Sequence, residues 1–426
     1  MTTTSIRPEQ HGEADAAGRS TRPGRRHPLS AFAGFPRAVW VVFSGIVVNR
    51  IGFLVGPFLV FFLGSRGIPP SQTPYVLGAL GAGNLVGPAV GGWLADRGSR
   101  KLTMLAGLLG TAAAQGALFT APNVATMALA AIALSATATM VPPAASATLA
   151  DHVEPARRRE AFALIGWAVN IGTAVAGILG GYLAAHGYWM LFAIDAGTSV
   201  GYAAIVAMLL PTDRTARATS QNPAPAKAHG GSGYGIVLRD RLTRRLLILF
   251  SVQLFIYSLT ESALPLAIRT DGLSPAVMGM VAAVNAGLVV ALQPVATTFL
   301  ARFPRTPVLS AGSALIFTGI ALTGLAHSPA AYAATVALWS VGEVVGSGIP
   351  NSLIANLAPA DAVGRYQGAF NWAWGLARFL ALAVGTTVYT LGPAVLWWGT
   401  LAAGAAATAG VAALGPAADR RTGGSR

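Results

Sequence analysis

Hydrophobic and polar positions alternate along the chain in long blocks. A helix that crosses the hydrocarbon core of a bilayer needs about 20 mostly apolar residues, and twelve such stretches follow one another between short polar joints. The predicted spans are residues 37–63, 74–95, 102–120, 124–150, 160–184, 187–210, 244–268, 276–300, 307–326, 329–358, 366–388 and 392–415. The pattern predicts an all-α membrane protein with 12 transmembrane helices.

The long polar break at residues 211–243 divides these spans into two sets of six. It is rich in proline and glycine, which is typical of a linker. We therefore predict an N-terminal six-helix bundle over 37–210 and a C-terminal six-helix bundle over 244–415. Residues 1–36 are polar and Arg/Pro-rich and lack the apolar core of a signal peptide, so they are predicted to be a disordered cytoplasmic tail. Residues 416–426 are predicted to form a second cytoplasmic tail.

The two sets of spans also resemble each other. Pro57 lies opposite Pro265, Pro143 lies opposite Pro350, and Arg159 lies opposite Arg365, all at an offset of roughly 207 residues. Such parallel repeats predict two pseudo-symmetric bundles that rock around a binding site near the middle of the membrane.

Composition agrees with a membrane protein and excludes several other classes. The chain is 54% hydrophobic and 10% charged, against about 25% charged residues in soluble proteins. Its net charge of +14 is spread over the joints rather than gathered on one face, so no nucleic-acid partner is expected. The chain has no cysteine, and its six histidines form no ligand-spaced cluster, so no metal site is expected.

The distribution of the basic residues predicts the orientation of the chain. Lys and Arg are concentrated in the tails, the linker and the even-numbered joints, whereas the odd-numbered joints hold only Arg66 and Arg269. Because basic residues are retained on the cytoplasmic side, both termini are predicted to be cytoplasmic.

The turn between the second and third spans carries a recognisable motif. It reads Gly91-Gly92-Trp93-Leu94-Ala95-Asp96-Arg97-Gly98-Ser99-Arg100-Lys101. This turn resembles the Gly-x-Leu-x-Asp-Arg-x-Gly-Arg-Lys signature of the major facilitator superfamily, although the glycine after Asp-Arg is displaced by one place. The matching residues are Gly92, Leu94, Asp96, Arg97, Arg100 and Lys101. The resemblance covers residues 37–415 and implies that Asp96 docks on the eleventh helix and latches the outward-open state.

The fifth span resembles the antiporter motif of the 12-helix drug/proton antiporters in this superfamily. Asn170, Gly172, Gly180 and Gly181 are in register with that motif, whereas Ala176-Gly177 replaces the usual Gly-Pro pair. The fourth span lacks the intramembrane arginine of many such antiporters. The resemblance implies antiport, and small residues at these spacings also allow helices to pack closely.

Five ionisable residues lie well inside the predicted spans: Arg50, Asp195, Glu261, Glu343 and Arg378. Each costs about 2.5–3.5 kcal/mol at the centre of a membrane, so we expect them to be paired and to face a cavity. In the superfamily, helices 1, 4, 7 and 10 line the central cavity, which implies that Arg50, Glu261 and Glu343 lie there. We predict Glu261 and Glu343 as proton-coupling groups, with Arg50 and Arg378 as counter-charges. A permanent ion pair is the alternative for either glutamate, and Arg50 has a second candidate role in binding an anionic substrate.

Neighbouring positions add candidates for the lining of the cavity. Tyr257 lies four residues before Glu261, and Trp339 lies four residues before Glu343. Gln367, Asn371, Trp374 and Arg378 share one helical face, and Asn49 precedes Arg50. The aromatic rings are predicted to contact a lipophilic or cationic substrate, with simple packing as the alternative.

These features predict a secondary active transporter in the cytoplasmic membrane of a bacterium, acting as a monomer and driven by the proton gradient without a cofactor. We predict proton-coupled efflux of small lipophilic or drug-like molecules by alternating access. The alternative is proton-coupled uptake of a small solute such as a peptide or organic acid. Asn49-Arg50-Ile51-Gly52-Phe53 resembles part of the Glu-Arg-Phe motif of peptide symporters, but the accompanying glutamates are missing, which counts against uptake. The sequence contains no ATP-binding loop and no nucleophile–base set, so an enzyme is not expected.

Overall fold

The computed structural model describes residues 35–97, 99–154, 157–210, 235–300, 302–359 and 362–422. These residues are helical and contain no β-strand. The first half comprises α1 (Arg37–Ile51), α2 (Val55–Ser65), α3 (Thr73–Arg97), α4 (Arg100–Thr120), α5 (Val124–His152), α6 (Arg158–His186) and α7 (Tyr188–Leu209). The second half begins with α9 (Gly235–Arg239), α10 (Arg241–Ser258), α11 (Ala263–Thr270), α12 (Pro275–Leu300) and α13 (Arg305–Leu322). It continues with α14 (Pro329–Gly346), α15 (Ile349–Leu357), α16 (Val363–Leu380), α17 (Thr386–Leu391) and α18 (Pro393–Arg421).

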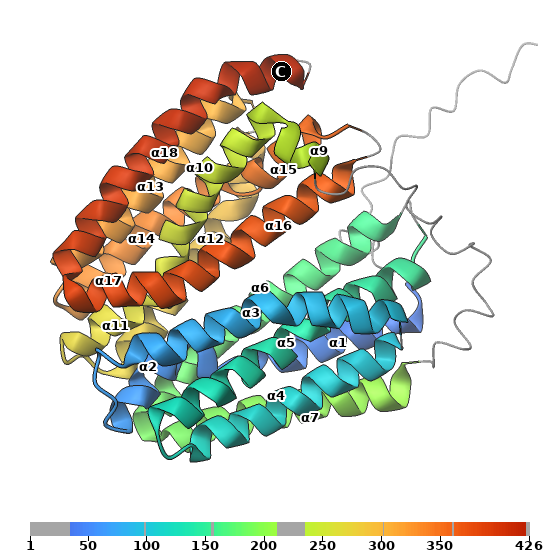
Figure 1. The fold of residues 1–426 in the computed structure, drawn as a ribbon, viewed down its shortest axis with the longest axis vertical. Helices are drawn as coiled ribbons and strands as arrows, with labels where there is room; N and C mark the ends of the chain where they lie inside the picture. The colour runs from blue at the N-terminus through green and yellow to red at the C-terminus, as the bar shows by residue number, and fades with distance from the viewer. Residues whose placement is uncertain are drawn as a thin grey trace, which may run out of the picture.

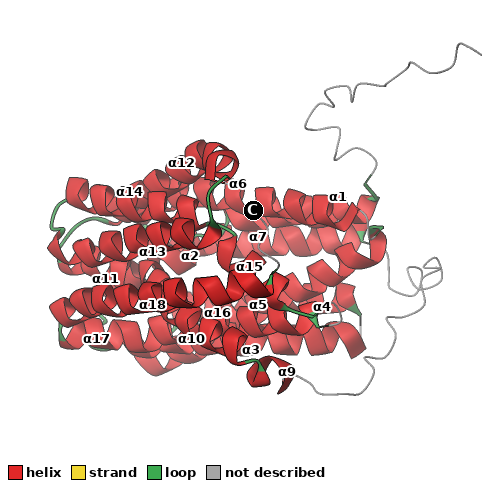
Figure 2. Ribbon diagram, turned by 90° about the horizontal axis from the view of Figure 1, so that it is seen from above, coloured by secondary structure: helices red, strands yellow, loops and turns green. Residues whose placement is uncertain are grey.

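The helices run roughly parallel (Figures 1 and 2) and form two groups, one from each half, which Figure 1 separates. Because successive helices alternate in direction, the joints gather at two ends of the molecule. We call the end that holds Arg37, Leu209 and Gly235 the linker end, and the opposite end, which holds the joints at 66–72 and 271–274, the far end. Most of residues 1–36 and of the predicted linker, together with the last four residues, lie outside the described ranges.

Nine of the described helical segments are long and apolar enough to cross a membrane. The sequence predicts twelve spans, and several of these are interrupted in the structure. The first is broken at residues 52–54, between α1 and α2. The seventh is broken by a 3₁₀ turn at Leu259–Glu261, the tenth at residues 347–348, and the eleventh by a π-helical segment at Ala381–Gly385.

The breaks in the first and seventh spans follow from the repeat in the sequence. α2 begins at Val55 and α11 at Ala263, and each carries a proline, Pro57 or Pro265, as its third residue. Proline has no N–H, and the first turn of a helix leaves its N–H groups unpaired, so proline is tolerated there. In the tenth span, Gly348 has φ 73°, a conformation that favours glycine, and Pro350 follows in the first turn of α15.

The buried apolar residues show where the two halves meet. One cluster contains residues of both halves, including Phe58 and Leu191 from the first and Leu266 and Phe317 from the second. The other two clusters belong to one half each, around Met104 in the first and Phe250 in the second. The shared cluster lies toward the far end, whereas the two separate ones lie toward the linker end. The halves are therefore joined mainly at the far end.

Candidate functional site

Glu261 and Arg378 form an ion pair between the broken seventh and eleventh spans. Both Nε and Nη2 of Arg378 lie 2.7 Å from Oε2 of Glu261. The Glu261 side chain is 46% exposed and that of Arg378 is 32% exposed, so the pair is accessible even though both residues lie within helical spans. The structure thus joins a predicted coupling acid to a predicted counter-charge, while their roles in proton transfer stay a prediction.

This ion pair lies next to a segment of the eleventh span that contacts the first half. Ser262, next to Glu261, donates a hydrogen bond to the carbonyl oxygen of Ala381 at 3.1 Å, and Ala381 opens the π-helical segment. The same part of the eleventh span packs on α3 of the first half, where a β-carbon at Gly78 would lie 3.2 Å from Cβ of Ala383. The charged pair and the packed interface therefore share one short stretch of helix.

Glu343 has a different environment, because its described partners are neutral. The Tyr257 hydroxyl donates to Oε1 at 2.9 Å, and the Asn285 amide donates to Oε2 at 3.0 Å. Asn285 also donates to the hydroxyl of Ser340 at 3.0 Å. The helical spacing predicted that Tyr257 lies beside Glu261, whereas the structure turns its hydroxyl toward Glu343. Asn285 was not predicted from the sequence, although it is one of only two amides, with Gln293, in the apolar span 276–300.

Arg50 lies on the first-half side of these charges. Its guanidinium carbon is 5.3 Å from the centre of the Phe53 ring, and it lies close enough to Glu261, Arg378 and Asp195 to interact with their charges. Within the described residues, however, its guanidinium forms no ion pair. Both predicted roles of Arg50, as a counter-charge and as a group that binds an anionic substrate, remain predictions.

Asp195 stabilises the backbone at the break in the first span. Its Oδ2 accepts hydrogen bonds from the backbone N–H groups of Leu54 at 3.3 Å and Val55 at 3.2 Å, where α2 begins. A carboxylate at a helix N-terminus satisfies otherwise unpaired amides. Nearby, Asn49 donates to the hydroxyl of Ser199 at 3.2 Å, so α7 is attached to both sides of the break.

The glycines of the antiporter-like fifth span face two different partners. A β-carbon at Gly172 would collide with Cβ of Arg50, and one at Gly180 would collide with the ring of Phe58. Gly177 and Gly181 instead face α12 of the second half, where a β-carbon at Gly181 would lie 2.7 Å from Cα of Gly279. One helix therefore packs against the first span on one face and against the other half on another. The side chain of Asn170 lies outside the described residues.

The motif between α3 and α4 is only partly described. Arg100 donates to the carbonyl oxygen of Ala147 at 2.7 Å and forms an ion pair with Asp151. Lys101 donates to the carbonyl oxygens of Ala207 and Leu210, both at 2.7 Å. These bonds stay within the first half. The side chains of Asp96 and Arg97 lie outside the described residues, as does Gly98, so the predicted latch, which also includes Gly92, stays a prediction.

The remaining candidates for the cavity lining differ in exposure. Trp339 is 6% exposed and packs edge-on against Tyr257, with 6.1 Å between the ring centres. Gln367 donates to the carbonyl oxygen of Asn351 at 2.9 Å. Asn371 is exposed, and Trp374 is 44% exposed. Among the four residues predicted to share one face of the eleventh span, Gln367 and Arg378 thus bind other helices of the second half.

Arg269 connects the two halves at the far end. This residue of α11 donates to the carbonyl oxygen of Val60 at 3.1 Å and to that of Ile68 at 2.7 Å, both in the first half. A β-carbon at Gly64 would lie 2.5 Å from Nε of Arg269, so a side chain there would displace the guanidinium. Arg269, which the sequence marks as one of the two basic residues in the odd-numbered joints, therefore bridges the halves through backbone acceptors.

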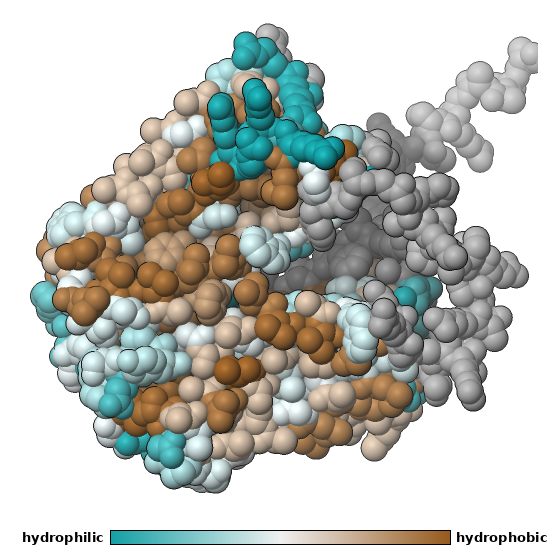
Figure 3. Space-filling model, in the orientation of Figure 1, coloured by the Kyte–Doolittle hydropathy of each residue, from teal (hydrophilic) through white to brown (hydrophobic). Residues whose placement is uncertain are grey.

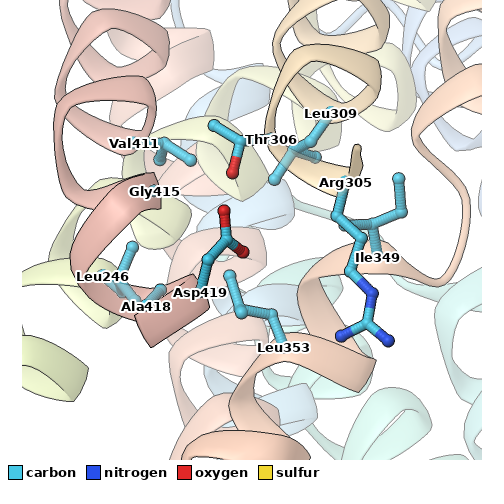
Figure 4. Close-up of a pocket in the computed structure, with 10 residues that line it drawn as sticks. All are labelled: Leu246, Arg305, Thr306, Leu309, Ile349, Leu353, Val411, Gly415, Ala418 and Asp419. Atoms are coloured by element: carbon cyan, nitrogen blue, oxygen red, sulfur yellow. The ribbon is translucent and has the colours of Figure 1, made fainter. Parts of the chain in front are cut away.

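The small pockets of the second half lie away from these charges. A pocket of about 10 Å³ is lined by residues of α10, α13, α15 and α18, with Asp419 directed toward Thr306 and the guanidinium of Arg305 directed away (Figure 4). That volume approximates one water molecule, so this pocket is too small for a transported solute. A groove of about 340 Å³ between α13 and α18 is lined by small and apolar residues. Within the described residues, no three His, Asp or Glu side chains could hold a metal ion.

Comparison with known proteins identifies the family. The sequence profile of the Major Facilitator Superfamily matches residues 41–382. The uncharacterized MFS-type transporter YqjV of Bacillus subtilis is 23% identical over 353 residues, which cover 81% of this chain and 83% of the relative. The multidrug resistance protein MdtH of Aeromonas salmonicida is 26% identical over 280 residues, which cover 66% of this chain and 68% of the relative.

Solved structures show the same fold. The crystal structure of a peptide transporter of the POT family matches with a TM-score of 0.74 at 16% identity, covering 92% of this chain and 96% of that one. The structure of PepTSo from the same family matches with a TM-score of 0.71. At this identity the likeness extends to the fold alone. The profile match, in contrast, spans most of the chain, and the protein therefore belongs to the Major Facilitator Superfamily of multi-pass membrane transporters.

Proposed function

We propose that this protein exports small lipophilic or drug-like molecules across a bacterial cytoplasmic membrane in exchange for protons. The observation that carries the proposal is the pair of carboxylates in the second half, Glu261 with Arg378 and Glu343 with Tyr257 and Asn285. Charged groups inside membrane spans are costly and typically mark ion or substrate pathways. The similarity to MdtH supports drug-like substrates.

In this proposal, protonation of Glu261 neutralises the carboxylate and weakens its bond to Arg378. The released guanidinium and the adjoining π-helical segment then rearrange against α3, which changes the contact between the halves. Arg378 and Arg50 stabilise the ionised acid once the proton has left. An inward proton that crosses 100 mV supplies about 2.3 kcal/mol, which supports roughly a fifty-fold gradient of substrate.

The proposal includes the topology predicted from the basic residues. It takes residues 37–210 and 244–415 as two six-helix bundles joined by a cytoplasmic linker, with both termini in the cytoplasm. The linker end then faces the cytoplasm, and the structure, joined at its far end, represents an inward-facing conformation of a monomer. It also takes the protein as a transporter without enzymatic activity.

Uptake of a small solute is the second candidate. Peptide transporters of the POT family share the fold of this protein, although the sequence around Arg50 lacks the glutamates of the peptide-symporter motif. Arg50, which forms no ion pair with a described residue, suits a carboxylate-bearing substrate. Uptake and export predict opposite proton movements, so one measurement separates them.

The test is substrate-induced proton movement in inside-out vesicles that contain the full-length protein. Export by antiport predicts proton release from acidified vesicles when lipophilic cations are added, whereas symport predicts proton movement in the same direction as the solute. Glu261→Gln and Glu343→Gln are compared with Glu154→Gln, which changes an exposed glutamate outside the site. If both site variants retain full coupled flux, the assignment of the coupling groups is wrong.

A further inference from the structure

Exposed arginines gather at the linker end of the second half. They come from the short helix α9, the first turns of α10 and the last turn of α18, where the hydrophilic atoms in Figure 3 form a continuous area. We call this set the arginine patch, and its members are Arg239, Arg241, Arg244, Arg245, Arg420 and Arg421. Like charges placed so close together repel one another unless an anion balances them.

Two acids lie near the patch among the described residues, and neither balances it. Asp240 is almost buried, and its Oδ2 lies 2.8 Å from Nη1 of Arg421. Burial raises the pKa of Asp240, but hydrogen bonds from Arg421, Thr243 and Tyr366 outweigh it and lower the pKa to about 2. Asp240 therefore stays ionised and is occupied by one arginine. Asp419 points into the small pocket beside Thr306 (Figure 4).

Most of the patch remains available to an external anion. Among the described residues, no hydrogen bond or ion pair involves the side chains of four of its members, namely Arg239, Arg241, Arg245 and Arg420. Arg244 donates only to the carbonyl oxygen of Leu238 at 2.6 Å. The patch thus offers several guanidinium groups whose planar N–H donors match phosphate oxygens.

The surface directly beside the patch is apolar. Leu238, which precedes Arg239, is 61% exposed, and Ile248, one turn beyond the arginines of α10, is 59% exposed. This change from basic to apolar surface within one or two helical turns is the arrangement expected where a protein passes from lipid headgroups into hydrocarbon.

The undescribed segments of the chain do not suit the patch. Residues 1–34 and residues 211–234 each contain more basic than acidic residues, so both carry the same sign of charge as the patch. Neither of these two segments therefore supplies a net negative charge, and the apolar border favours an anionic partner that is attached to hydrocarbon.

We propose that the arginine patch binds the headgroups of anionic phospholipids in the leaflet at the linker end. Juxtamembrane clusters of four to eight basic residues attract such lipids. The patch concentrates this attraction on α9, α10 and α18, so the lipids contact the second half rather than the whole circumference. The proposal does not depend on the transported substrate or on proton coupling.

The test counts lipids bound to the full-length protein. The protein in nonionic detergent is titrated with phosphatidylglycerol or with phosphatidylcholine of identical acyl chains, and bound lipids are resolved by native mass spectrometry. We expect the parent to prefer phosphatidylglycerol and Arg241→Gln/Arg245→Gln to lose about tenfold or more of that preference, because each arginine contributes a factor of about five. The control, Arg37→Gln/Arg302→Gln, removes two exposed charges at the same end but outside the patch and should change it by less than about twofold.

Three results would overturn the proposal. The first is that the parent protein shows no preference for phosphatidylglycerol. The second is that both double variants lose the preference equally, which would indicate diffuse positive charge. The third is that soluble inorganic phosphate displaces the lipid at equal concentration, which would indicate a site for free anions. Thermal unfolding of both variants, measured in the same detergent, shows whether a lost preference reflects loss of the patch or of the fold.

Discussion

Replacing Gly181 with valine tests whether the contact between α6 and α12 determines which end of the protein is closed. Gly181 and Gly279 meet backbone to backbone, and a β-carbon at Gly181 would lie 2.7 Å from Cα of Gly279. Carbon atoms in favourable contact are about 3.5–4.0 Å apart. The two helices must therefore separate by about 1 Å to accept the first atom of the new side chain, and further for its methyl groups.

The size of the effect follows from the usual cost of overpacking. Extra methyl groups in a packed interface cost about 1–3 kcal/mol. If only the conformation closed at the far end carries this cost, its population relative to the alternative conformation falls by about 5- to 150-fold. Gly197→Val is a matched control, because no atom of another helix lies within 4 Å of a β-carbon at Gly197.

The absence of cysteine makes the measurement direct. Cysteines introduced at Ser71 and Ser274, which are exposed at the far end on opposite halves, carry spin labels whose separation is read by pulsed electron paramagnetic resonance. We expect Gly181→Val to move the distance distribution to longer values and Gly197→Val to leave it unchanged. If Gly181→Val is folded and shows the same distribution as the parent, the packed glycines do not govern closure.

The remaining predictions concern three charged residues. Arg269→Gln removes two hydrogen bonds between the halves, so the same spin labels should report longer far-end distances. Arg66→Gln is the control and should not change them, because the bonds of Arg66 stay within the first half. An equal effect of both substitutions would contradict the bridging role of Arg269. Asp195→Ala leaves two amides of α2 unpaired and should lower the unfolding free energy by about 1–3 kcal/mol, whereas Asp195→Asn retains an acceptor and should cost less, as measured by thermal unfolding in detergent. Asp240 has its pKa lowered to about 2 from 3.8, so its ionised form stabilises the fold by about 2 kcal/mol above pH about 4, and this stabilisation is lost as the pH falls toward 2. The difference in thermal midpoint between the parent and Asp240→Asn should therefore be largest near neutral pH and shrink on acidification; a difference independent of pH would contradict the linkage.

The sequence predicts the helical membrane architecture well, because a run of apolar residues long enough to cross a bilayer has few other interpretations. The broken first and seventh spans are less evident, although Pro57 and Pro265 occupy equivalent places after the breaks. Apolar length alone cannot separate one helix from two short helices in line, because both bury the same side chains.

The partners of the intramembrane acids were harder to predict. Glu261, Glu343 and Arg378 are evident in the sequence, but which acid binds the arginine depends on how the broken helices are oriented. Asn285 was not predicted because α12 is apolar on nearly all sides, and the face of such a helix that meets its neighbours cannot be read from periodicity. Direct contact between residues distant in sequence is what the structure adds.

The bridge at Arg269 has a consequence for how freely this end of the protein can change during evolution. Because its acceptors are the backbone carbonyls of Val60 and Ile68, most substitutions at those two positions would leave the bond intact. Gly64 is different, since any side chain there would push the guanidinium aside. This hydrogen-bonded bridge between the halves therefore depends on only two side-chain identities, one arginine and one glycine. The residues whose carbonyl groups accept these bonds can diversify without loss of the bridge.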